Sequence, residues 1–386
     1  MSTAPDLSTM RPTWADIDSG AFARNCAAVA KRLPAGSSLI AVMKADAYGH
    51  GAAELAKRCT PDHVAMIGVI LLEEAVELRR AGVSMPILIM GPLKQQQIAI
   101  AVDNDMTIGV PGPEELEAAV AVARDRDVHI HLKLDSGMGR MGSTGDELPQ
   151  VIEMIRSTPR LKLDAIYTHF ASSGDPNDRF IDEQTSNFDS LVEQLRSAGI
   201  TAPRHHRANS GATMRGLARP GEYVRVGLTL YGGEPLDAGV SRLEPVMRWR
   251  TEIMRMKMLP RGHAIGYGMT FHTNRPTRVA TLPVGYADGY NRLLSNRGEV
   301  IVRGRRAPVV GRVSMDLVTI DVTEIPEAAL GDEVVLLGTQ DRQTVTAEEI
   351  ASKIGTISYE VFCSVSARVP RVYRDGNHLT IQTRFA

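Results

Sequence analysis

The sequence predicts an α/β protein with two domains, an N-terminal (β/α)8 barrel of the TIM type and a C-terminal, mainly β domain. One observation is the length of 386 residues, which exceeds the ~250 to 300 residues at which a single core usually stops growing. A second is a regular alternation of strand-like and helix-like segments up to about residue 234. The third is the change to successive strands after that point, which divides the chain into residues 1–240 and 241–386.

Eight short apolar runs predict the strands of the barrel. They are too continuously apolar for a half-exposed sheet, and such runs are typical of strands buried on both faces. Amphipathic stretches separate them, and eight βα units in about 200 residues indicate a closed barrel. The runs are SLIAVMK, HVAMIGV, MPILIMG, MTIGV, VHIHLKLD, LKLDAIYTHF, PRHHRANS and EYVRVGLTLYG.

After Glu234 the pattern is one strand after another with glycine-rich turns between them. Only one convincing helix, near TAEEIASKIG, interrupts the strands. This organisation predicts a mainly β second domain.

Composition excludes several classes of partner. Lys plus Arg number 44 against 45 Asp plus Glu, so we expect no nucleic-acid partner and no binding to anionic membranes. The longest apolar stretch, residues 64–72, is too short to span a bilayer. Cys26, Cys59 and Cys363 are widely spaced, which predicts neither a disulfide framework nor a metal site and favours a cytoplasmic location.

Catalytic groups of such barrels lie at the C-terminal ends of the strands. The first strand ends at Lys44. A lysine against apolar walls has its charged form disfavoured, so its amine can attack an aldehyde. The alternative is a lysine that only ends a strand and points into water.

The fifth strand places its polar residues on one face, toward the barrel lumen. An inward ammonium needs compensation, and the loop SGMGRMG that follows presents Arg140 in a setting suited to a carboxylate or phosphate. A purely structural pair of Asp135 with Lys133 or Arg140 is the alternative. The inward residues are His129, His131, Lys133 and Asp135.

The last three strand ends predict an anion site. The sixth strand ends at His169, and the seventh is followed by neutral donors and a glycine, as in phosphate cradles. On the eighth, alternation turns Arg225 inward and leaves Gly227 small enough for phosphate to approach the backbone. Lone histidines are more often core residues than catalysts, so the pattern as a whole indicates an enzyme with a phosphorylated cofactor or substrate. The residues after the seventh strand are His206, Asn209 and Ser210.

The run AVMKADAYGHG resembles the pyridoxal 5'-phosphate attachment motif of the alanine racemase family, and the resemblance continues from Trp14 to Tyr373. It implies pyridoxal phosphate as cofactor, interconversion of L-alanine and D-alanine for peptidoglycan, and a homodimer with shared active sites. The other matching motifs are RPTWADID, KLDSGMGRMG, YTHFASS, ANSGA, VRVGLTLYG, GYGMTF, LPVGYADGY, VGRVSMD and ISYEVFCSVSARVPRVY.

The resemblance assigns two acid/base groups. Lys44 would bind the cofactor covalently and then act at the substrate Cα, and Tyr267 of the partner subunit would act on the opposite face. A tyrosine with a pKa of ~10 is a poor base at neutral pH and needs nearby positive charge. His169 and Arg225 are the candidates, and His206 would extend their hydrogen-bond chain.

The resemblance also assigns the cofactor contacts. Arg225 would face the pyridine nitrogen and, because a guanidinium keeps its protons, would leave that nitrogen unprotonated. The weaker electron sink that results favours racemisation over transamination. The phosphate would be bound by Tyr48, Ser210, the backbone near Gly227 and Leu228, and Tyr359, with Asn209 in support.

For the substrate, the resemblance implies that Arg140 and the backbone N–H of Met315 bind the carboxylate. Lys133 would be carbamylated and would orient Arg140, while Tyr286 and Tyr359 would narrow the entrance. Departures from the family pattern are Asp46 for the commoner Asn, Ile70 and Leu71 for small residues, and Met269 after the catalytic tyrosine.

Three alternatives remain at this level. One is a racemase of broader specificity or with a preference for serine. Another is a barrel decarboxylase of basic amino acids, against which Arg225 argues because an acidic residue is expected there, although Cys363 superficially fits it. The third is a non-catalytic pyridoxal phosphate carrier, which would lack the second domain.

Overall fold

A computed structural model describes residues 7–175, 177–234, 243–375 and 378–383. The chain divides into two compact units. The barrel unit comprises residues 23–47 and 52–243, and the β unit comprises residues 1–22, 48–51 and 244–386.

The barrel unit contains an eight-stranded sheet of parallel strands in the order β8-β7-β6-β5-β4-β3-β2-β9. The first and last strands of this order are linked by a hydrogen bond from Arg225 N to Ala208 O of 2.9 Å, so the sheet is nearly closed. The strands are β2 (Ser38–Val42), β3 (Val64–Val69), β4 (Ile87–Ile89), β5 (Met106–Val110), β6 (Val128–Lys133), β7 (Leu161–Tyr167), β8 (Arg204–His206) and β9 (Tyr223–Val226). The predicted (β/α)8 barrel is confirmed.

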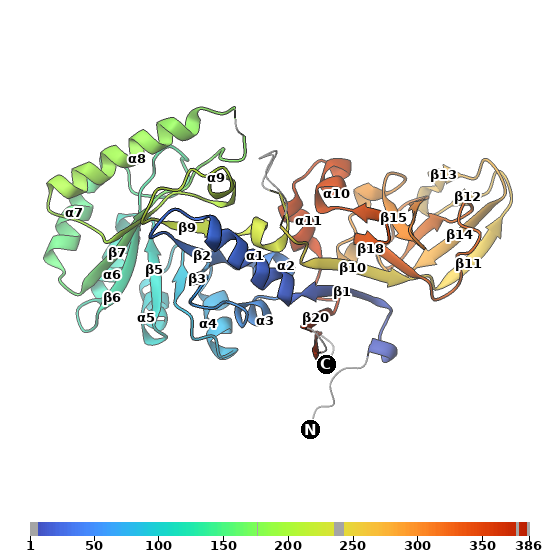
Figure 1. Cartoon of the computed structure of the whole chain (residues 1–386), viewed down its shortest axis with the longest axis horizontal. Coiled ribbons are helices and arrows are strands. Elements are labelled where there is room, and N and C mark those ends of the chain that lie inside the picture. Colours follow the sequence, from blue (N-terminus) through green and yellow to red (C-terminus); the bar gives the residue numbers. More distant parts are fainter. Residues whose placement is uncertain (1–6, 176, 235–242, 376–377, 384–386) are drawn as a thin grey trace, which may run out of the picture. The chain divides into compact units, whose positions relative to one another are not determined.

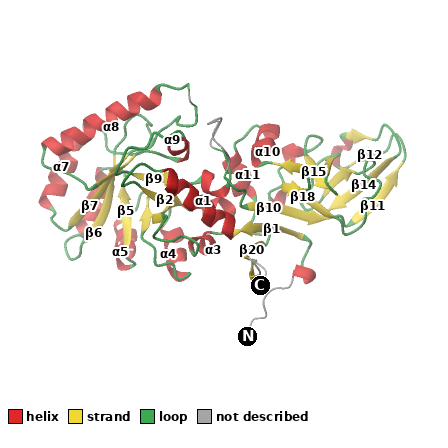
Figure 2. Ribbon diagram, in the orientation of Figure 1, coloured by secondary structure: helices red, strands yellow, loops and turns green. Residues whose placement is uncertain are grey.

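Helices alternate with these strands and cover the outside of the sheet (Figures 1 and 2). The longest, α8 (Phe180–Ser197), buries Ile181, Gln184, Phe188, Leu191 and Leu195, which have the three-to-four-residue spacing of one helix face. The others are α1 (Ser19–Arg32), α2 (Lys44–Gly49), α3 (Ala52–Ala56), α4 (Leu72–Arg80), α5 (Gln95–Asp103), α6 (Pro113–Val122), α7 (Leu148–Ser157) and α9 (Ser210–Met214).

The β unit is built on a second eight-stranded sheet, with the order β16-β15-β18-β10-β1-β20-β21 and β19 paired to β18. Its strands are β1 (Thr13–Asp18), β10 (Met247–Glu252), β15 (Glu299–Val302), β16 (Arg305–Pro308), β18 (Glu333–Gln340), β19 (Gln343–Val345), β20 (Arg371–Asp375) and β21 (His378–Gln382). Smaller sheets contain β11 (Arg255–Leu259), β14 (Thr277–Leu282) and β17 (Val318–Asp321), and the pair β12 (Ala264–Ile265) and β13 (Phe271–His272).

The prediction of a single helix in the second half is wrong. In the part that the structure describes, α10 (Ala347–Ile354) matches the predicted helix and α11 (Ser358–Ser364) follows it. The β-branched and aromatic residues of SYEVFCS favour a strand by propensity, but burial of Val361 and Phe362 on one helix face decides otherwise.

The N-terminal strand lies in the β unit. β1 pairs antiparallel with β10 and parallel with β20, although division at residue 240 would group it with the barrel. Nothing in the local pattern of TWADID identifies its sheet, because pairing partners distant in sequence decide it. The predicted boundary falls in residues 235–242, which lie outside the described residues.

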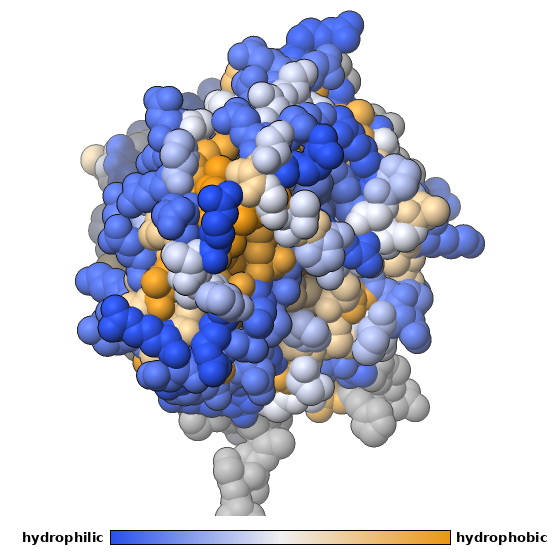
Figure 3. Space-filling view, turned by 90° about the vertical axis from the view of Figure 1, so that its left-hand side faces the viewer, coloured by the Kyte–Doolittle hydropathy of each residue, from blue (hydrophilic) through white to orange (hydrophobic). Residues whose placement is uncertain are grey.

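Hydrophilic side chains cover most of one side of the molecule and surround a smaller apolar patch (Figure 3). None of the helices in the described ranges is long and apolar enough to cross a membrane.

Candidate active site

Lys44 begins a left-handed turn. It is separated by one residue from the end of strand β2 and is the first residue of α2, and the next four residues have φ values of +52°, +52°, +53° and +55°. These residues, Ala45 to Tyr48, are not glycines, so left-handed backbone costs ~1 to 2 kcal/mol for each of them. Strain of this kind persists where surrounding contacts impose it, which is common at functional sites.

Arg225 is buried in the barrel and has five hydrogen-bond acceptors. Its Nη1 donates to the carbonyl of His206 (2.8 Å) and its Nη2 to those of Thr168 (2.6 Å) and Arg207 (3.2 Å). The same groups lie 2.7 Å from Nδ1 of His206 and 3.2 Å from Nδ1 of His169. Because a guanidinium only donates, both histidines accept at Nδ1 and carry their proton on Nε2.

A third histidine, His131, continues this chain of hydrogen bonds. Nε2 of His206 lies 3.0 Å from Nδ1 of His131, and the ring of His206 stacks on Tyr167 at 4.5 Å. Burial and the charge of Arg225 lower the pKa of His206 well below its ordinary value, and that of His131 to about 3. Both imidazoles are therefore neutral at neutral pH, and hydrogen bonds link His169, Arg225 and His206.

Four cations gather around His169. Burial and then the charges of Arg225, Lys133, Arg140 and Lys44 lower the pKa of this histidine well below its ordinary value. Burial, Arg140 and Arg225 also lower the pKa of Lys133 to about 8. This concentration of positive charge is suited to a ligand with several anionic groups.

Asp135 shapes the loop after β6. Its Oδ1 accepts hydrogen bonds from the backbone N–H groups of Gly137, Met138 and Gly139, at 2.9, 2.8 and 3.2 Å. The carboxylate therefore shapes the loop that presents Arg140, whose side chain is exposed.

The loops after β8 and β9 form a cradle of backbone N–H groups. Asn209 caps α9 by accepting from Ala212 N at 3.1 Å, and Ser210 Oγ accepts from Gly227 N at 3.0 Å. Leu228 begins the 3-10 helix η2 (Leu228–Tyr231). Two short helices thus start side by side, and the first N–H groups of a helix have no partner within it and suit phosphate.

The β unit holds the remaining predicted residues. The rings of Tyr48 and Tyr359 lie 5.9 Å apart, and burial raises the pKa of both phenols. A second group lies on neighbouring loops, where Tyr286 N donates to Ser314 O (3.0 Å) and Ala287 N donates to Met315 O (3.1 Å).

Large apolar side chains are exposed on these loops and on the segment 267–269 of the same unit. Tyr267 is 74% exposed, Met269 64%, Met315 52% and Tyr286 42%. Tyr267 lies in the short 3-10 helix η3 (Tyr267–Met269), between glycines with φ values of +73° and +69°. Burying such side chains needs another surface.

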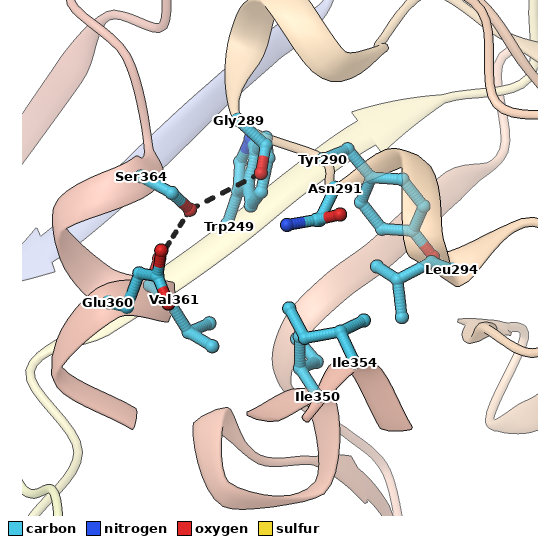
Figure 4. Close-up of a pocket in the computed structure, with 10 residues that line it drawn as sticks. All are labelled: Trp249, Gly289, Tyr290, Asn291, Leu294, Ile350, Ile354, Glu360, Val361 and Ser364. Carbon is cyan, nitrogen blue, oxygen red and sulfur yellow. Dashed lines mark hydrogen bonds between the residues drawn. The ribbon is translucent and has the colours of Figure 1, made fainter. Parts of the chain in front are cut away.

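A small pocket lies in the β unit (Figure 4). It is lined by residues that follow Tyr286 and by residues of α11, which carries Tyr359. Ser364 Oγ joins the two segments by donating to Gly289 O (3.3 Å) and Val361 O (2.8 Å). None of the predicted site residues lines this pocket.

Comparison with known proteins decides the family. The model of the alanine racemase N-terminal domain matches residues 17–235, and that of the C-terminal domain matches residues 246–373. This chain belongs to the alanine racemase family. The predicted family and an enzyme of the isomerase class are thereby confirmed.

Alanine racemases of known sequence and structure resemble it along nearly their whole length. The enzyme of Halothermothrix orenii is 40% identical over 95% of this chain and 97% of its own. The Bacillus anthracis alanine racemase, crystallised with bound L-Ala-P, has a TM-score of 0.91, 32% identity and 99% coverage of both chains. That of Bartonella henselae, with covalently bound pyridoxal phosphate, has a TM-score of 0.85, 25% identity and coverage of 95% and 100%.

The sequence patterns gave no role to three residues that contact the predicted site residues or their backbone: His131, Tyr167 and Glu74. His131 was placed in the lumen but given no role, although it bonds His206. Tyr167 stacks on His206 and lies under Arg225, whose guanidinium carbon is 5.3 Å from the ring centroid. Glu74 contacts the turn after Lys44. The inward side of alternating strands could have indicated the first two, but Glu74 has no sequence signal.

Proposed function

We propose that this chain interconverts L-alanine and D-alanine with pyridoxal 5'-phosphate, using Lys44 and Tyr267 as the two acid/base groups, and supplies D-alanine for peptidoglycan. The observation that carries the proposal is buried Arg225, whose guanidinium is held by the carbonyls of His206 and Thr168 and bonds the imidazoles of His206 and His169. Family membership supports the same reaction.

The residues predicted to bind the cofactor have side chains and backbone groups of suitable chemistry. Ser210, Gly227 and Leu228 would bind its phosphate, with Asn209 as the helix cap, and Tyr48 and Tyr359 would add phenol donors. Arg225 would meet the pyridine nitrogen, because its Nε–H makes no hydrogen bond to any residue that the structure describes. Lys44 would attach to the aldehyde. When bound, the cofactor withdraws electrons from the substrate Cα and acidifies its hydrogen.

Arg225 sets how strong that withdrawal can be. It cannot give its proton to an acceptor, and its carbonyl and imidazole partners hold it in place. Arg225 therefore favours return of a proton to Cα over competing reactions, and its charge through His169 assists ionisation of a tyrosine.

Tyr267 would come from a second copy of the chain. Its phenol is exposed beside other exposed apolar residues of the same loops, which a homodimer would cover. Lys44 and Tyr267 would then hold and release the Cα proton on opposite faces of the substrate. Measuring the mass in solution across a dilution series tests the dimer, and a monomer at all active concentrations would refute it.

The substrate carboxylate would be bound by Arg140 and the backbone N–H of Met315. Lys133, with its pKa lowered to about 8, is about one tenth neutral at pH 7, and this neutral amine would form a carbamate that orients Arg140. Tyr286 and Tyr359 would restrict the side chain of the substrate to a small group.

The experiment that tests the function is incubation of the purified holoenzyme with L-alanine, followed by enzymatic assay of D-alanine, beside Lys44→Ala and Tyr267→Phe. We expect the wild type to racemise alanine, Lys44→Ala to be inactive, and the racemisation rate of Tyr267→Phe to be about 10²- to 10⁴-fold lower than that of the wild type. Lack of absorbance from lysine-bound cofactor would refute the cofactor assignment, and unchanged Tyr267→Phe would refute the two-base assignment. Parallel assays with L-serine and larger amino acids test a broader specificity.

A further inference from the structure

The turn after Lys44 is packed at its end but not at its start, because Ala47 and Tyr48 are buried whereas the two residues before them are not. Ala45 and Asp46, its first two left-handed residues, are exposed to solvent. Exposed alanine and aspartate would relax to the right-handed or extended backbone unless specific contacts prevented it. Specific contacts must therefore impose the left-handed backbone of these two residues.

One carboxylate binds the residue that follows the lysine. Glu74 Oε1 accepts a hydrogen bond from Ala45 N at 2.6 Å. Its Oε2 accepts from Ile70 N at 2.9 Å and from Leu71 N at 3.0 Å, at the start of α4. An ionised carboxylate can accept all three bonds, and bonds to a charged acceptor are the stronger kind.

The position of Glu74 makes it a rigid anchor. It lies in the first turn of α4, which buries Leu72, Ala75 and Leu78 in the barrel unit. On the other side of Lys44, Met43 N donates to Gly68 O at 2.8 Å. The backbone is therefore tied immediately before and immediately after the lysine. Further along, Asp46 Oδ1 accepts from Ala52 N at 2.6 Å.

We propose that Glu74 is a positioning residue for Lys44, whose carboxylate imposes the left-handed turn that directs the lysine amine. This inference rests on the proposed function. A lysine side chain has four flexible carbons, so the place of its amine depends on the backbone from which it starts. Small displacements of a reacting group are sufficient to slow catalysis strongly.

The test compares four forms of the holoenzyme: wild type, Glu74→Gln, Glu73→Gln, and Glu74→Gln combined with Ala45→Gly. Glu73 is the matched control, since it lies on the same helix turn and is exposed. A carboxamide oxygen has two lone pairs and cannot accept three bonds. The readouts are kcat/KM for alanine, the rate at which bound cofactor is lost during gel filtration, and the thermal unfolding of the apoenzyme.

We expect Glu74→Gln to lower kcat/KM by about 10- to 100-fold and to release cofactor faster, with Glu73→Gln at the wild-type level. Glycine adopts a positive φ without steric cost, so Ala45→Gly should restore part of both losses. The proposal is overturned if Glu74→Gln matches Glu73→Gln, if it lowers only the unfolding temperature, or if Ala45→Gly restores nothing. A wild type without lysine-bound cofactor would instead contradict the proposed function.

Discussion

Acid should destabilise the barrel unit through two buried histidines. The side chains of His131 and His206 are almost wholly buried, and their pKa values are lowered, that of His131 to about 3. In the unfolded chain the pKa is ~6.5, so below that pH only the unfolded chain takes up these protons. The contribution of these neutral histidines to the free energy of unfolding is therefore fully present above neutral pH. It is lost as the pH falls toward their pKa values in the folded chain. Between pH 7 and pH 5 the loss is ~2 kcal/mol for His131, and His206 adds to it in the same direction.

Urea unfolding of the apoenzyme at pH 7 and pH 5 measures this difference. In His131→Gln the difference should shrink by ~2 kcal/mol, whatever the stability of the variant at pH 7. The exposed His63 provides the control, because His63→Gln should leave the difference as in the wild type. A His131→Gln variant that loses as much stability as the wild type would refute the reasoning.

Three further outcomes are expected. Carbon-13 NMR in labelled bicarbonate should show one carbamate signal that is absent in Lys133→Ala. The signal should grow from pH 7 to pH 9, because the pKa of Lys133 is lowered to about 8 and the neutral amine that forms the carbamate increases over this range. A plain amine on Lys133 at ambient bicarbonate would contradict this. Asp288→Asn should lower the free energy of unfolding by ~2 kcal/mol, since it weakens the charged hydrogen bonds of a part-buried pair with Arg11. Unchanged stability in urea unfolding would exclude that role. Gly285→Ala would place a Cβ 2.3 Å from Met315 O, so KM for alanine should rise at least several-fold, and an unchanged KM would show that the two loops move independently.

Much of the fold follows from local patterns. Continuous apolar runs of five to eight residues are recognisable as buried strands, and alternation on β9 correctly turned Arg225 inward. The reason is that strand burial and side-chain direction depend on near neighbours in the chain. The α11 helix and the sheet to which β1 belongs escaped the same reasoning, because distant segments decide both.

The site divides in the same way. By itself the sequence determined the barrel, the strand-end positions of Lys44, His169, Ser210 and Arg225, and the family. Only the tertiary structure decided the tautomers of the histidines around Arg225 and the left-handed backbone after Lys44. Hydrogen bonds between residues far apart in sequence, such as the 29-residue separation of Ala45 and Glu74, impose those states, and no local pattern records such partners.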